Sequence, residues 1–202
     1  MRTRTVFLIT AFLLVSIGLS DVFAQVQIGA TITDEGLKGF YVAIGEYYRV
    51  PEREVIVIRE RKIPDDEIPV VLLIAERARV KPAAVIELRL AGKSWMDIAF
   101  HFKLTAEIFY VELKRTPGPP YGKAYGYYRN TPRKEWGKIV LADADVVNLV
   151  NLKFVSEHYG HSPDEVIKLR AKGGTFVGIH SEVKKVKEVQ KAKMKEKKEK
   201  RK

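Results

Sequence analysis

The sequence predicts an all-α protein: a helical repeat array of short helix-turn-helix units, with one long Tyr/Gly/Pro-rich loop and a charged C-terminal tail. Apolar residues recur at helical spacing along most of the chain. One helix pattern occurs three times, as VIVIR from Val55, VIELR from Val85 and VIKLR from Val166. Repetition of a two-helix unit is typical of stacked helical arrays.

The clearest copy of the unit is the stretch 85–99, VIELRLAGKSWMDIA. Pro82 suits the first turn of its first helix, and Gly92 suits the left-handed residue that follows the helix. Ser94 and Asp97 form a variant of the capping box, which predicts the start of a second helix.

A second copy lies 81 residues later, where Ser162, Pro163 and Glu165 predict a helix start and Gly173 the turn. A weaker copy lies 30 residues before the clearest one. The predicted helical repeat domain is 25–183, with units at about 35–68, 65–102 and 143–183, a loop at 115–138 and a lysine-rich tail at 184–202.

The elements are expected in a simple order along the chain. Asp34 is a candidate cap for the first helix, and Pro, Gly and Tyr predict no regular helix in 115–138. Strands remain an alternative at 25–34 and at the β-rich run 55–58. The expected helices are 35–48, 52–62, one from Pro64, the two of the second unit, 106–114, one from Asp143 or Asp145 to Tyr159, and the two of the third unit.

Residues 1–24 have the pattern of a secretory signal peptide, with Arg2 and Arg4 before an apolar run and small residues near Ala24. The apolar run is shorter than the roughly 20 residues that span a bilayer, although an uncleaved anchor is the alternative. We therefore expect a periplasmic or secreted protein after removal of residues 1–24. The chain has no cysteine and so no disulfide framework.

The formal net charge of +11 belongs mostly to the tail. Residues 184–202 contain eleven Lys or Arg and three Glu, a net +8, and residues 1–24 contribute +1. Residues 25–183 therefore carry only +2 (11 − 8 − 1). The tail Lys184 to Lys202 predicts weak contact with an anionic membrane surface, or else a solvated tail.

The predicted loop contains the candidate binding residues. Aromatic rings there alternate with cations, and such a mixture suits a glycan, a protein partner or another anionic ligand. The alternative is that the rings fix the loop to the helical core. The candidate ligand- or partner-binding residues are Tyr121, Tyr125, Tyr127, Tyr128, Arg129, Arg133 and Trp136.

Residues 82–114 resemble the helix-turn-helix modules of bacterial transcription regulators and sigma factors, over about a sixth of the chain. The resemblance implies a recognition helix at 106–114. That segment is AEIFYVELK, which is too apolar for a DNA groove, so nucleic acid is an unlikely partner. The matching residues are Val85, Ile86, Leu88, Gly92, Ser94, Ile98, Ala99, Phe102, Leu104 and Thr105.

No catalytic motif is present, and the sequence predicts neither an enzyme nor a cofactor. Arg59, Arg89 and Arg170 share one position of the unit, where a cation offsets the dipole of a helix end. His158 and His161 provide two ligands, too few for a metal site. We expect an exported, non-catalytic binding or scaffold protein of the cell envelope, whose partner is an unknown envelope protein or a polyanionic glycan. The alternatives are a nucleic-acid-binding helix-turn-helix protein and an unrecognised envelope enzyme.

Overall fold

A computed structural model describes residues 33–199, and every regular element in that range is a helix, which confirms the all-α class. The expected signal peptide, residues 1–24, and nearly all of the possible strand 25–34 lie outside the described residues. The elements are α1 Asp34–Tyr48, α2 Glu52–Glu60, η1 Asp65–Glu67, α3 Ile68–Ala78, α4 Pro82–Leu90, α5 Trp95–His101, η2 Ala106–Phe109, α6 Gly122–Asn130, η3 Arg133–Lys138, α7 Asp143–Tyr159, α8 Pro163–Ala171 and α9 Phe176–Glu199.

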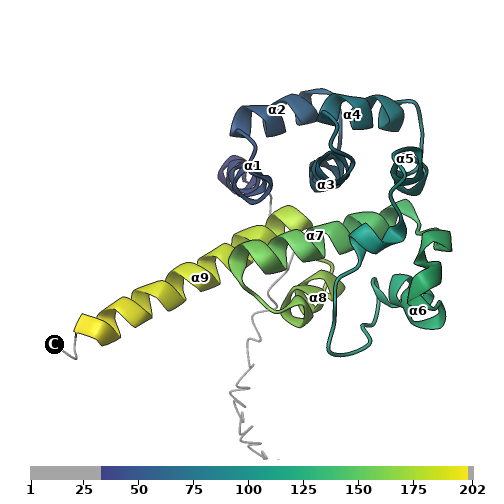
Figure 1. Cartoon of the computed structure of the whole chain (residues 1–202). Coiled ribbons are helices and arrows are strands. Elements are labelled where there is room, and N and C mark those ends of the chain that lie inside the picture. The colour runs from purple at the N-terminus through teal and green to yellow at the C-terminus, as the bar shows by residue number, and fades with distance from the viewer. Residues whose placement is uncertain (1–32, 200–202) are drawn as a thin grey trace, which may run out of the picture.

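The helices form layers around α7 (Figure 1). Helices α1, α3 and α5 lie in one row, α2 and α4 cover one side of that row, and α7 crosses its other side. Helix α8 packs on the far side of α7, and α6 lies at one end of the body. The core is centred on α7, where Val146, Leu149 and Phe154 are fully buried.

Three nine-residue helices, α2, α4 and α8, have equivalent bounds. Each begins 30 or 81 residues from the next, at Glu52, Pro82 and Pro163. The backbone turns after them are also equivalent, because Lys62, Gly92 and Gly173 have φ of 64°, 81° and 86°. The preceding helices end alike, on the left-handed residues Arg49, Arg79 and Gly160. Glycine thus marks only some of these turns, and the others force a non-glycine residue into the same conformation.

The run 55–58 is helical, and the strand alternative is wrong. Val55 and Ile58 are 0% and 1% exposed and lie three residues apart, while Ile56 and Val57 point outward. This is the three-residue period of a helix face rather than the two-residue period of a strand.

The predicted capping residues hold two of the helix starts. Ser94 accepts a hydrogen bond from the Asp97 backbone N–H at 3.1 Å, and Asp97 accepts one from Ser94 N–H at 3.2 Å. Glu165 accepts from the backbone N–H and the hydroxyl of Ser162, both at 3.0 Å. Thr33, rather than Asp34, caps α1.

Two expectations between α5 and α7 are wrong. The helix expected at 106–114 is a 3-10 turn that ends at Phe109, because Ala106 and Phe109 enter the core and the chain then extends. The expected loop 115–138 contains α6 and η3. Two glycines are tolerated in α6 because its other face is anchored by buried Tyr125 and Tyr128.

Helix α9 packs on the body through its N-terminal half, as far as Lys187, and then projects away from it (Figure 1). Val183 is buried, whereas Val186 and Val189 are 42% and 53% exposed. The helix persists to Glu199, as the spacing of these valines indicates. Within residues 33–199, no helix is both long and apolar enough to span a membrane.

Candidate binding site

Four aromatic rings fix the segment that connects α5 to α7. Tyr110, Tyr125, Tyr128 and Trp136 form one cluster, with ring centroids of Tyr110 and Trp136 4.7 Å apart. The Tyr128 hydroxyl donates to the Ala106 carbonyl at 2.7 Å. The Tyr125 hydroxyl and the Trp136 ring N–H also donate to backbone carbonyls. The polar ring atoms of Tyr125, Tyr128 and Trp136 therefore hold this segment rather than being left free for a ligand.

Most of the predicted aromatic platform is buried. Tyr121, Tyr125, Tyr128 and Trp136 are between 1% and 8% exposed, while Tyr127 is 40% exposed. Burial raises the pKa of the Tyr121, Tyr125 and Tyr128 hydroxyls well above the usual range, so all three stay neutral. The structure thus favours the interpretation that these rings pin the segment to the core.

A cavity of about 300 Å³, here called the aromatic cavity, opens beside this cluster. It brings together Tyr125, Tyr128, Arg129 and Trp136 of the predicted residues, and leaves out Tyr121, Tyr127 and Arg133. Residues 113–116 were not among the predicted binding residues, although the adjacent cations Lys114 and Arg115 could have indicated an anion-binding site. The lining residues are Tyr110, Leu113, Lys114, Arg115, Thr116, Tyr125, Tyr128, Arg129 and Trp136.

The cations of the aromatic cavity have no carboxylate partner. Lys114, Arg115 and Arg129 are exposed, and within residues 33–199 none of them makes an ion pair. Arg133 differs, because it pairs with Glu107 at 3.0 Å and its guanidinium lies 5.2 Å from the centre of the Trp136 ring. Three unpaired cations around an aromatic floor form a site suited to a carboxylate, sulfate or phosphate group.

Comparison of the chain with protein-family models, curated proteins and solved structures gives no match. The functional argument therefore rests on the geometry of the chain itself.

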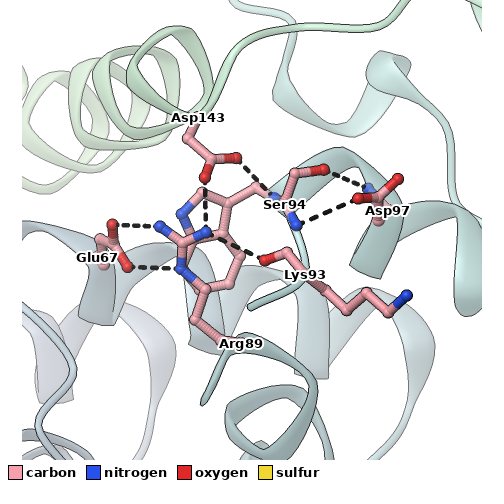
Figure 2. Close-up of polar contacts among 7 residues, drawn as sticks. Glu67, Arg89, Lys93, Ser94, Asp97 and Asp143 are labelled. Atoms are coloured by element: carbon pink, nitrogen blue, oxygen red, sulfur yellow. Dashed lines mark hydrogen bonds and ion pairs between the residues drawn. The ribbon is translucent and has the colours of Figure 1, made fainter. Parts of the chain in front are cut away.

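A second polar cluster surrounds Arg89 (Figure 2). Its guanidinium donates to both carboxylate oxygens of Glu67 at 3.0 and 2.7 Å, to Asp143 at 2.6 Å and to the Lys93 carbonyl at 3.1 Å. It lies 4.5 Å from the centre of the Trp95 ring, whose backbone N–H also donates to Asp143 at 2.7 Å. Burial by itself would lower the pKa of Arg89, but the hydrogen bonds to Glu67 and Asp143 raise it. The charges of Arg89, Glu67 and Asp143 are paired with one another, so the cluster joins η1, α4, α5 and α7, although the buried ring N–H of Trp95 has no hydrogen-bond partner.

Arg170 repeats this geometry without a carboxylate. It donates to the Gly174 carbonyl at 2.8 Å, to Asn148 at 3.0 Å, and lies 4.7 Å from the centre of the Phe176 ring. Arg59 is more exposed and pairs with Asp65 at 3.5 Å. Arg89 and Arg170 donate hydrogen bonds to backbone carbonyls in the turn after their helices. Their predicted role, which is to offset the dipole of a helix end, therefore extends to that turn.

His158 and His180 lie at the junction of α1, α7 and α9. His180 is 1% exposed, and its Nδ1 lies 2.7 Å from the Tyr159 hydroxyl. Burial, with the nearby charges of Lys184 and His158, lowers the pKa of His180 to about 4. Among residues 33–199, no group of three or more His, Cys, Asp or Glu side chains could hold a metal ion.

Proposed function

We propose that this chain is an exported, non-catalytic binding or scaffold protein that contacts an anionic ligand through the aromatic cavity. The proposal rests on one observation. Lys114, Arg115 and Arg129 line a cavity with aromatic walls and have no carboxylate partner within the described part of the chain. Cations that serve the fold, such as Arg89, are paired. Unpaired cations that converge on a cavity are available for a ligand.

We propose in addition that the helices form an array of three related units around this site. The equivalent bounds of α2, α4 and α8, the matched left-handed residues and the matched contacts of Arg89 and Arg170 support this. In such an array each unit buries its apolar face on its neighbour. The array would then hold the aromatic cavity rigid, which reduces the entropy lost when a ligand binds.

The signal-like residues 1–24 support a periplasmic or secreted location, and α9 supports an accessory electrostatic contact. Residues 184–199 carry eight Lys and three Glu, a net +5, on a helix that projects from the body. Each basic residue near an anionic surface contributes about 1 kcal/mol, and salt screens this contribution. The tail therefore adds affinity for polyanions without selecting among them.

Point variants test this proposal better than deletion of 116–138, because that deletion would remove buried Tyr128 and Trp136 from the core. The mature chain from Gln25 is titrated with polygalacturonic acid, a carboxylated glycan, by calorimetry at low salt. Arg115→Gln and Arg129→Gln are each expected to weaken binding about tenfold, because each removes a charge-assisted contact. The matched control is Lys123→Gln, an exposed cation of α6 outside the cavity.

Equal losses in all three variants would mean that net charge alone drives binding, and would overturn the role of the aromatic cavity. A chain that ends at Lys184 measures separately how much the tail contributes to the binding of polygalacturonic acid. If that shortened chain no longer binds polygalacturonic acid, the tail and not the cavity holds the ligand.

A further inference from the structure

A second cavity, of about 390 Å³, adjoins the aromatic cavity. We name it the helix-end cavity, because Arg77 lies in the last turn of α3 and Lys103 follows α5. Lys153 of α7 forms its other side. The lining residues are Arg77, Lys103, Leu104, Thr105, Glu107, Ile108, Tyr110 and Lys153.

The two cavities meet at Tyr110, which lines both. The Tyr110 ring packs on Trp136 at 4.7 Å and on Tyr128 at 5.1 Å, so the cluster holds its position. A ligand that occupied both cavities would therefore contact this fixed aromatic residue.

The charges of the helix-end cavity leave it positive. Lys153 is paired with Glu157 at 2.8 Å, and Glu107 is paired with Arg133 at 3.0 Å, so these two pairs cancel. The C-terminal ends of α3 and α5 add about half a negative charge each. Arg77 and Lys103 add two positive charges and make no ion pair within residues 33–199. The balance is about one positive charge, which is enough to favour one anionic group of a ligand.

We propose that the two cavities are consecutive subsites for one extended, carboxylated glycan. This inference rests on the proposed function and specifies its ligand. One carboxylate lies among Lys114, Arg115 and Arg129, the chain crosses Tyr110, and a further carboxylate lies at Arg77 and Lys103. Thr105 and the paired acid Glu107 present hydrogen-bonding groups to the hydroxyls between them.

A glycan fits these subsites better than a peptide does. The described residues contain no strand, so no sheet edge there is available to bind a peptide backbone. A helical peptide would need an apolar groove, whereas both cavities are lined by several charged side chains. Separate polar hollows with cations suit sugar rings that carry hydroxyls and carboxylates.

Chain length provides the test, because a monomer can occupy one subsite and an oligomer both. Galacturonic acid and its linear oligomers of increasing length are titrated into the full mature chain. Linking two weak contacts is expected to raise affinity about a hundredfold once the oligomer spans both cavities. Arg129→Gln should weaken binding of monomer and oligomer alike. Lys103→Gln should weaken binding of the long oligomers about tenfold and should affect the monomer less, because a monomer fills one subsite at a time.

The outcomes separate this inference from the proposed function. If Arg129→Gln weakens monomer binding but affinity does not rise with length, the aromatic cavity stands and the two-subsite inference fails. If neither variant changes binding of any probe, the proposed function fails as well. A glutamate oligomer with the same number of carboxylates should bind more weakly; equal affinity would overturn the assignment to a glycan. Circular dichroism and thermal unfolding check that each variant is folded.

Discussion

Arg89 and Arg129 are the same residue type in opposite situations. Arg89 has a 20% exposed side chain and donates to two carboxylates and a carbonyl, so it joins η1, α4 and α7. Arg129 is exposed, lines a cavity and has no carboxylate partner within residues 33–199. The difference indicates that charge used for folding is paired, whereas charge available for binding is not.

The largest expected effect follows removal of Arg89. In Arg89→Gln, Glu67 and Asp143 remain partly buried without a cation, so unfolding free energy should fall by about 3 kcal/mol. Urea unfolding monitored by circular dichroism measures this loss. A Glu67→Gln, Arg89→Gln double variant should recover part of the loss, because one unpaired carboxylate is removed. A loss below about 0.5 kcal/mol in Arg89→Gln would contradict the structural role.

Low pH should destabilise the other end of the molecule from Arg89, where His180 is buried without a neighbouring anion. The unfolded His180 has a pKa near 6.5 and the folded one a pKa of about 4. Between these values the unfolded chain binds the proton preferentially, so unfolding free energy falls as pH decreases. We expect a loss of about 2 kcal/mol from this group between pH 6.5 and about pH 4.5.

The control for this pH effect is His180→Gln, whose amide can still bond the Tyr159 hydroxyl. Thermal unfolding across the same pH range should show a smaller slope in this variant. His158 contributes in the same direction, since burial lowers its pKa too, although nearby Glu46 opposes this. Identical slopes in both proteins would exclude His180 as the cause.

Arg170 provides a second comparison with Arg89, because it makes similar contacts but its hydrogen-bond acceptors are neutral. Arg170→Gln leaves the Asn148 amide oxygen and the Gly174 carbonyl without this donor but breaks no direct ion pair. It also removes a charge that lowers the pKa of the half-buried Asp66 carboxyl, against the larger effect of burial. We therefore expect a loss of about 1.5 kcal/mol, clearly smaller than that of Arg89→Gln. Parallel urea titrations compare the two, and equal losses would mean that Glu67 and Asp143 are not the source of the difference.

The smallest stability effect is expected at Arg129. Arg129→Gln removes an exposed, unpaired cation, so unfolding free energy should change by less than about 0.5 kcal/mol. Thermal unfolding checks this, while the same variant is expected to weaken glycan binding if the proposed function holds. A large loss of stability would show that Arg129 serves the fold, and would remove the contrast with Arg89.

The sequence by itself determined the all-α class, most of the helices and several of their ends. Hydrophobic spacing and capping residues are local, so Ser94, Ser162 and the turns at Gly92 and Gly173 were predicted at the correct positions. It also identified 121–136 as unusual and found part of the aromatic cavity.

Only the tertiary structure decided which of those residues line the aromatic cavity. Tyr121 and Tyr127 have the same side chain, yet one is 1% and the other 40% exposed, because α6 turns one face to the core. The sequence placed 115–138 in a loop, since glycine and proline oppose an isolated helix, whereas packing of Tyr125 and Tyr128 stabilises one. Arg77 and Lys103 meet Tyr110 only because α3, α5 and η2 end at one surface. Contacts between distant segments leave no local pattern, so the full lining of the two cavities could not be predicted from the sequence.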